Sequence, residues 1–304
     1  MSQAPTRTKS AAPVSLLGDS SCLSDALRGL IDNPQFSDVT FVVGKERQTI
    51  HAHRCILASR CKVFHGMFSQ QLQEANPSQE LQVPFILADM QPEVFLAMME
   101  FLYTNSVTLN SIIALEVLTS AVEYGLDDLR KLCVEFISKT LTVELAFEAL
   151  QAAVTYGQTD LRHKSLTFIE RFTQEIIKTQ SFRELSEMGL LCILQSDRLT
   201  IDEVPLIQAV REWAHVSSVV LDIPVYTVAL EVVRELRLFL LSPEELTSVE
   251  KENSNDKLIP ESYIAQAWKF HALKKIGESQ SHLFHRRKGT LLREHHRYLE
   301  PLCK

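Results

Sequence analysis

The chain has 304 residues, of which 45% are hydrophobic and 23% charged, with only 9 glycines and a net charge of −7. This balance is typical of a globular protein of about two domains, and it excludes collagen-like and low-complexity chains. Residues 1–13 carry +2 and residues 277–304 carry +3, so residues 14–276 carry −12. Because phosphate binding needs concentrated Lys and Arg, we expect no nucleic-acid partner.

The spacing of the cysteines and the length of the apolar segments indicate where in the cell the protein is expected. The six cysteines form no C-x-x-C pair, and the first residues have no apolar core of signal-peptide length. No stretch approaches the ~18 apolar residues of a membrane span. We therefore expect a protein with reduced thiols in the cytoplasm, or also in the nucleus, and no membrane partner.

The first third of the chain mixes helix and strand patterns. Residues 1–20 are polar and rich in Ser, Ala and Pro, which predicts disorder. Alternating or periodic apolar residues then predict the following elements: a helix over 23–31, a hairpin of strands 39–43 and 48–52, short helices near 55–60 and 62–69, a strand over 81–87, and a helix from Pro92 to about Tyr103.

The next part contains an internal repeat. Residues 114–137 align without gaps to residues 146–169, with 12 of 24 positions identical. In each copy a helix would end at Gly125 or Gly157, and Asp127 or Thr159 would start the next helix as its N-cap. The repeat therefore predicts stacked helical hairpins.

The rest of the chain is predicted to be helical as well. Ser242 is expected to cap a helix with Pro243 at its first position. The other expected elements are short helices over 182–185 and 190–194, a helix with an apolar stripe over 206–214, a long helix over 225–241, a polar linker over 250–257, and a last helix over 263–273.

Candidate metal ligands occur in two places. The first set comprises His51, His53, Cys55, Cys61 and His65. The spacing C-x5-C-x3-H of its last three members matches no usual zinc finger, so we favour core thiols and a structural histidine over a metal. The second set lies near the C-terminus, where a solvated basic tail is the favoured interpretation. It comprises His282, His285, His295 and His296. No catalytic signature occurs, so we expect no enzyme and no cofactor.

Short motifs in fixed order give the chain a family resemblance. They are Ser37-Asp38-Val39, Ala52-His53-Arg54, Leu57-Ala58-Ser59, Val63-Phe64, Met67-Phe68, Pro92-Glu93-Val94-Phe95 and Phe101-Leu102-Tyr103-Thr104. Residues 36–140 thereby resemble a BTB/POZ domain. Departures are Asn105, where that family usually has Gly, and Cys61-Lys62 in place of Ser-Pro. Asn tolerates the left-handed geometry that such a glycine adopts.

Further motifs lie in residues 141–169, 181–214, 236–246 and 258–273. Through them the helical part resembles the BACK domain that follows many BTB domains, with 258–273 similar to that family's closing helix. The resemblance implies an α+β fold class, with a small mixed α/β BTB/POZ domain followed by an all-α BACK domain of helical hairpins. The expected boundaries are a disordered N-terminus over 1–20, a BTB/POZ domain over 21–140, a BACK domain over 141–275, and a basic C-terminal tail over 276–304.

The resemblance implies a dimeric substrate adaptor for a cullin-3 ubiquitin ligase. Leu72-Gln73-Glu74 matches the family's apolar-x-Glu cullin motif, four residues after Phe68. The expected cullin contacts are Leu72, Glu74, Phe68 and Tyr103. The motif arises easily by chance, so a polar loop with one stray leucine is the alternative. A second alternative for the whole chain is a dimeric interaction scaffold with no link to ubiquitination.

Two further surfaces follow from the resemblance. The expected dimer interface comprises Leu23, Leu27, Leu30, Asp38 and His53, whereas packing of the first helix on its own domain is the alternative. An unknown protein substrate would bind the BACK domain or the basic tail. The tail carries large apolar residues among its bases, so it would either recruit a partner or dock on its own helices.

Overall fold

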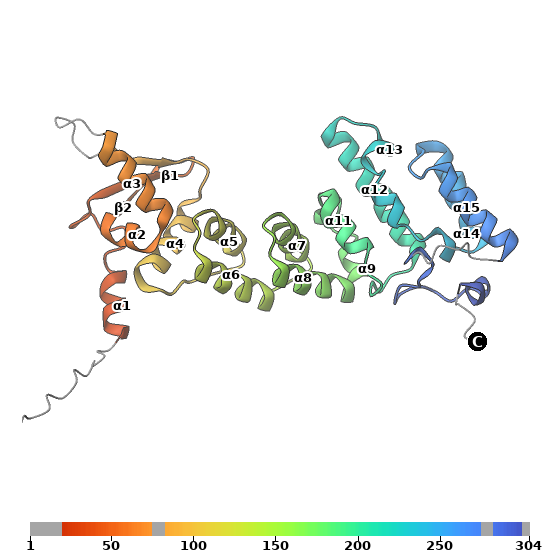
Figure 1. Cartoon of the computed structure of the whole chain (residues 1–304), viewed down its shortest axis with the longest axis horizontal. Helices are drawn as coiled ribbons and strands as arrows, with labels where there is room; N and C mark the ends of the chain where they lie inside the picture. Colours follow the sequence, from red (N-terminus) through yellow and green to blue (C-terminus); the bar gives the residue numbers. More distant parts are fainter. Residues whose placement is uncertain (1–19, 75–82, 275–281, 300–304) are drawn as a thin grey trace, which may run out of the picture. The chain divides into compact units, whose positions relative to one another are not determined.

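The computed structural model describes residues 20–74, 83–274 and 282–299. The chain folds into two units, one formed by Met1–Ile113 with Glu123–Leu129 and the other by Ala114–Val122 with Arg130–Lys304. Figure 1 labels their helices and strands.

The first unit contains a three-stranded sheet of order β2-β1-β3. The expected hairpin is confirmed, because β1 (Val39–Val43) pairs antiparallel with β2 (Gln48–Ala52). β3 (Phe85–Leu87) pairs parallel with β1, so the third strand is shorter than the expected 81–87. Residues 81 and 82 lie outside the described residues.

Within residues 20–74 and 83–113 the sheet is joined by the helices α1 (Ser20–Arg28), α2 (Arg54–Arg60), α3 (Lys62–Glu74) and α4 (Pro92–Thr104). Its core is aromatic, because the buried ring of Phe41 lies 4.9 to 6.4 Å from the rings of Phe64, Phe68, Phe85 and Phe95. α4 ends at Asn105, whose φ of 59° is left-handed and whose N–H donates to the Phe101 carbonyl. Asn105 thus supplies the geometry expected of it.

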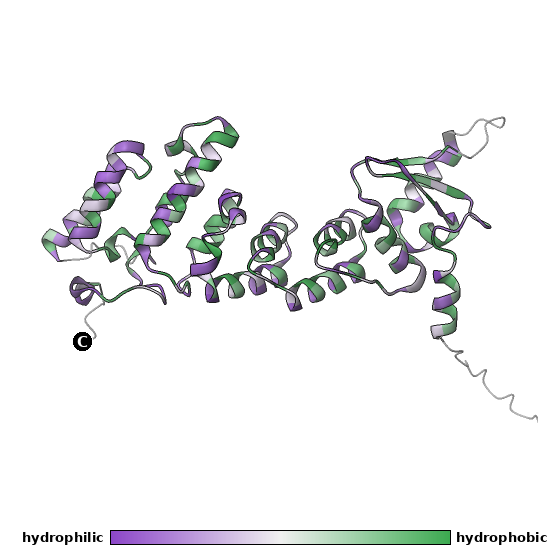
Figure 2. Ribbon diagram, turned by 180° about the vertical axis from the view of Figure 1, so that it is seen from behind, coloured by the Kyte–Doolittle hydropathy of each residue, from purple (hydrophilic) through white to green (hydrophobic). Residues whose placement is uncertain are grey.

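The repeat folds as two helix pairs, α5 (Ala114–Glu123) with α6 (Asp127–Lys139) and α7 (Leu145–Thr155) with α8 (Thr159–Arg171). Gly125 and Gly157 have φ of 66° and 64°, as expected of helix-ending glycines. Thr159 is not the N-cap that we expected, because it is already helical and Gln158 precedes it. In Figure 2 apolar and polar residues alternate along these helices, as amphipathic helices require.

The second unit continues with helices around one apolar core that includes Trp213. Among the described residues, no helix is both long and apolar enough to cross a bilayer. The elements are α9 (Thr173–Ile176), α10 (Gln180–Arg183), α11 (Glu187–Leu194), α12 (Glu203–Leu221), α13 (Val225–Val228), η1 (Val232–Glu235), η2 (Leu238–Leu240), α14 (Pro243–Asp256), α15 (Glu261–Leu273), η3 (His282–Phe284) and η4 (Glu294–Tyr298).

The expected long helix over 225–241 is wrong. The chain there breaks into α13, η1 and η2, and Leu236 is extended with ψ of 131°. The backbone N–H of Arg237 donates to the buried Glu203 carboxylate at 2.6 Å. In an unbroken helix this N–H would donate to the carbonyl four residues earlier. A tertiary hydrogen bond therefore interrupts an apolar sequence that favours a helix.

The expected polar linker over 250–257 is also wrong, because α14 continues to Asp256. The buried amide of Asn253 bonds the backbone of Ile259 in both directions, and Arg211 on α12 pairs with Glu252 and Asp256. Polar residues thus bind one face of this helix to its neighbours. The start of α14 is as expected, since Ser242 and Glu245 form a capping box ahead of Pro243.

Candidate protein-interaction surfaces

Leu72 lies on the last turn of α3 and is 59% exposed. We expected it in a loop after the helix, but α3 extends to Glu74. The neighbouring Gln71 fixes this turn, because its side-chain oxygen accepts from Arg54 at 2.6 Å and its nitrogen donates to the Val83 carbonyl at 3.2 Å. The turn therefore holds an apolar side chain toward solvent on an ordered helix.

The other residues expected to contact a cullin differ in exposure. Phe68 and Tyr103 are each 4% exposed, so they belong to the core, and the structure assigns them no contact surface. Phe68 packs against Phe41 and Phe85 and thereby positions α3. The side chain of Glu74 lies outside the described residues.

The helix α1 has one face on its own domain and an apolar residue facing solvent. Ser24 donates to the Thr104 carbonyl at 3.4 Å, and Arg28 pairs with Glu100 at 3.1 Å, so polar contacts attach α1 to α4. Leu23 is 63% exposed, whereas Leu27 and Leu30 are half-buried. The structure is therefore compatible with both interpretations of this helix, packing on its own domain and a dimer interface, because α1 packs on its domain and still presents Leu23 outward.

Asp38 and His53 do not contact each other through a hydrogen bond in the described residues. Asp38 accepts from the backbone N–H of Arg54 at 2.7 Å. The backbone N–H of His53 donates to the Tyr103 hydroxyl at 2.9 Å, and that hydroxyl lies 2.9 Å from His53 Nδ1. Burial raises the pKa of Tyr103 to about 12, so the phenol stays neutral and can donate to the ring. Both residues therefore order the chain between β2 and α2.

The candidate metal ligands of the first unit do not converge. Cys61 is buried and its thiol donates to the Tyr124 carbonyl at 3.4 Å, whereas Cys55 is exposed. Within the described part of the chain, no three His, Cys, Asp or Glu side chains form a group that could hold a metal ion. His51, His53, Cys55, Cys61 and His65 thus give no metal site there.

The described C-terminal segment, residues 282–299, docks on the second unit, so the expected solvated tail is wrong. Arg287 enters the core with its side chain fully buried and pairs with the equally buried Glu203 at 3.1 Å. The same guanidinium donates to the carbonyls of Ser196 at 2.6 Å and Glu235 at 3.2 Å. These bonds satisfy a charge that would be costly if it were buried alone.

A second arginine holds the segment further along. Arg293 pairs with Asp202 and with Glu245, both at 2.6 Å. Burial alone would raise the pKa of both carboxyls, but the hydrogen bonds from Arg293 hold the pKa of each below its usual range. Arg293 thus connects the segment to the starts of α12 and α14.

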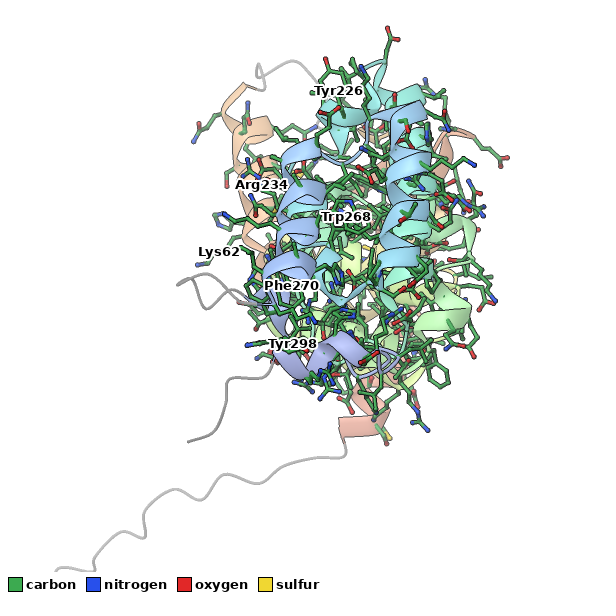
Figure 3. The ribbon with its side chains drawn as sticks, turned by 90° about the vertical axis from the view of Figure 1, so that its right-hand side faces the viewer. Lys62, Tyr226, Arg234, Trp268, Phe270 and Tyr298 are labelled. Carbon is green, nitrogen blue, oxygen red and sulfur yellow. The ribbon has the colours of Figure 1, made fainter. Side chains whose placement is uncertain are left out.

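Three histidine rings lie at the carbonyls of residues 239–241, in η2 and directly after it. His271, His295 and His296 each place Nε2 2.9 to 3.1 Å from a carbonyl, namely those of Leu241, Phe239 and Leu240 respectively. Burial lowers the pKa of all three rings, that of His295 to about 4. In Figure 3 Phe270 and Tyr298 lie near each other at this end of α15, and they share one apolar cluster. The neutral rings therefore serve as packing and hydrogen-bonding groups.

Sequence reasoning missed the buried ionic residues. Glu203, Arg237 and Arg287 are 0%, 0% and 2% exposed, although their types are almost always found at the surface. The only sequence signal was the set of large apolar residues among the bases of the C-terminal segment, which suggested that it packs somewhere.

Comparisons with known proteins find two domain families in this chain. The BTB/POZ domain family model matches residues 27–141, and the BACK (BTB And C-terminal Kelch) model matches residues 146–251. The chain is 53% identical to human BTB/POZ domain-containing protein 19 over 93% of its length and 96% of that protein, and equally so to the cattle protein. It is 29% identical to human BTB/POZ domain-containing protein 9, over 45% of that protein. The chain belongs to the BTB/POZ–BACK family of protein-interaction proteins.

Proposed function

We propose that the chain is a dimeric substrate adaptor of a cullin-3 ubiquitin ligase, acting in the cytoplasm or also in the nucleus. In this proposal the BTB/POZ region binds the cullin, and the BACK region binds the protein to be modified. The observation that carries the cullin assignment is the exposed Leu72 on the last turn of α3, at the place of the family's apolar-x-Glu motif.

The order of this turn supports the role of Leu72. An exposed leucine on a mobile loop would lose conformational freedom on binding, whereas Leu72 follows a Gln71 that is already bonded to Arg54 and Val83. The Arg54 guanidinium also lies 4.9 Å from the centre of the Phe68 ring, which adds to the fixation of α3. Leu72 is therefore a pre-positioned anchor for an apolar pocket.

Titration calorimetry of the full chain with the purified N-terminal region of cullin-3 tests the proposal. We expect binding by the wild type, and a loss of about 2 kcal/mol, or some thirtyfold in affinity, for Leu72→Asp. Ile112→Asp is the matched control, because Ile112 is also an exposed apolar residue of the first unit but lies outside α3. Undetectable wild-type binding at tens of micromolar would reject the adaptor, and equal affinity of the two variants would reject the anchor.

A further inference from the structure

The tip of the second unit carries an apolar surface that the domain core leaves exposed. Six large apolar side chains between residues 219 and 230 are 39% to 82% exposed. We call them the α12–α13 tip: Val219, Val220, Leu221, Ile223, Tyr226 and Leu230. Figure 3 places Tyr226 at the opposite end of this unit from Tyr298, so the docked C-terminal segment lies away from it. A grouped apolar surface of this kind indicates an interaction site more often than scattered apolar residues do.

The backbone of the tip is fixed. α12 ends at Leu221 with Asp222 in the left-handed conformation, at φ of 55°. The Ser218 hydroxyl donates to the Ile223 carbonyl at 2.6 Å, and the Ile223 N–H donates back to the Ser218 carbonyl at 3.2 Å. Pro224 then restricts the start of α13. The apolar side chains are thus presented by an ordered turn, which lowers the entropy lost on binding.

The charge around the tip indicates which kind of binding partner would fit it. Residues 212–233 include Glu212, Asp222 and Glu231 but no Lys or Arg. Glu231 is paired with Arg234 at 2.7 Å, so Asp222 and the C-terminal end of the α12 dipole supply the negative potential at the turn itself. An anionic membrane and the same tip of a second copy would both meet like charge here.

We propose that the α12–α13 tip is a docking surface for a basic amphipathic segment of a partner protein. The apolar side chains of that segment would cover the tip residues, and its Lys or Arg side chains would lie beside Asp222 and the end of α12. This inference deepens the proposed function by assigning the substrate side of the adaptor. It replaces the C-terminal segment in that role, because that segment is held in its own unit by Arg287 and Arg293.

A peptide-display selection tests the surface. The library contains random peptides of about 16 residues, which are long enough to form a helix with an apolar face. The bait is the full wild-type chain, with counter-selection on the triple variant Val219→Ser, Val220→Ser and Leu221→Ser. Because these side chains are exposed, the triple variant should keep the circular dichroism and the melting temperature of the wild type. We expect the recovered peptides to combine helically spaced apolar residues with Lys or Arg.

Fluorescence polarisation with the best recovered peptide then measures affinity. We expect about tenfold or weaker binding by the triple variant. Binding should also weaken as salt rises from about 50 to about 300 mM, with a smaller salt dependence for Asp222→Asn, which keeps the left-handed turn. Met188→Ser with Leu292→Ser is the matched control, because both side chains are exposed apolar residues elsewhere in the unit, and it should bind like the wild type.

Other outcomes would overturn the proposal. Acidic peptides, or peptides that bind the triple variant as well as the wild type, would reject a basic partner at this surface. A change of sedimentation in the triple variant would assign the tip to a second copy. Binding to phosphatidylserine vesicles that the triple variant loses would assign it to a membrane. The calorimetric cullin-3 titration of the triple variant is independent of all these results, so a failed tip and a failed adaptor are distinguishable.

Discussion

Arg287 and Glu203 lie 84 positions apart in the sequence, yet their side chains form an ion pair at 3.1 Å with neither exposed to solvent. Glu203 also accepts the backbone N–H of Arg237 at 2.6 Å, so one carboxylate fixes both the C-terminal segment and the break between η1 and η2. The segment 282–299 is thereby an integral part of the second unit.

This ion pair predicts a large loss of stability when one partner is removed. Arg287→Met should lower the free energy of unfolding by about 3–5 kcal/mol, because Glu203 is left as an uncompensated buried charge. Urea unfolding followed by circular dichroism measures the change. Arg297→Met is the control, since Arg297 pairs at the surface with Glu294, and it should change stability by about 0.5 kcal/mol or less. A loss for Arg287→Met no greater than that of the control would contradict the buried pair.

The close approach of Gly289 predicts a steric effect. A Cβ at this position would lie 2.0 Å from the Ile201 backbone nitrogen, and the backbone N–H of Gly289 donates to Leu199 at 2.8 Å. Gly289→Ala should therefore displace the segment, and hydrogen exchange should show faster exchange across residues 283–299. Gly66→Ala is the comparison, because a Cβ there meets nothing within 4 Å and α3 should gain about 0.5–1 kcal/mol. Unchanged protection in Gly289→Ala would show that the segment does not dock as described.

The three histidines around η2 predict a loss of stability in mild acid. Burial lowers the pKa of His271, His295 and His296 below the ordinary value of 6.5, that of His295 to about 4. Below about pH 6.5 the unfolded chain therefore binds protons that the folded chain does not, so the free energy of unfolding falls as the pH falls toward about 4.5. Melting temperatures across this range measure the effect.

A histidine variant separates this effect from general acid denaturation. His295→Gln removes the ring whose pKa is lowered to about 4, so the melting temperature of this variant should depend less on pH in that range. The paired carboxyls of Asp202 and Glu245 also have lowered pKa values, but their stabilising contribution is lost only at lower pH, as they protonate. The same pH dependence in the variant and in the wild type would exclude His295 as a source.

The exposed face of α1 predicts self-association of the chain. Leu23→Asp should shift a dimer toward monomer in sedimentation velocity at micromolar concentration, because a charge would be placed on the apolar side of an isologous interface. Met188→Asp, an exposed apolar residue of the second unit, is the control and should sediment like the wild type. A wild type that sediments as a monomer would reject the dimer.

The sequence alone predicts those elements for which the spacing of apolar residues and the capping residues indicate the same helix or strand. The alternating burial of Val39, Phe41 and Val43 follows directly from the spacing of apolar residues in β1. Gly125, Gly157 and Asn105 end helices with positive φ, and Ser242 with Glu245 starts one, because the chemistry of these ends lies within a few residues. The position of Leu72 in the motif was also readable, whereas its exposure on a helical turn was not.

The positions of the buried charges in the second unit depend on the packing of distant elements. The apolar residues 225–241 favour one helix, but the buried Glu203 takes the N–H of Arg237 and the helix breaks. Residues 250–257 look like a linker, yet Arg211 and the Ile259 backbone bind that polar face. Predictions from periodicity and composition place charged side chains in solvent. Arg287 instead lies in the core, where a carboxylate and carbonyls from distant elements stabilise it. Such partners are set by the packing of the whole unit, so no local pattern contains them.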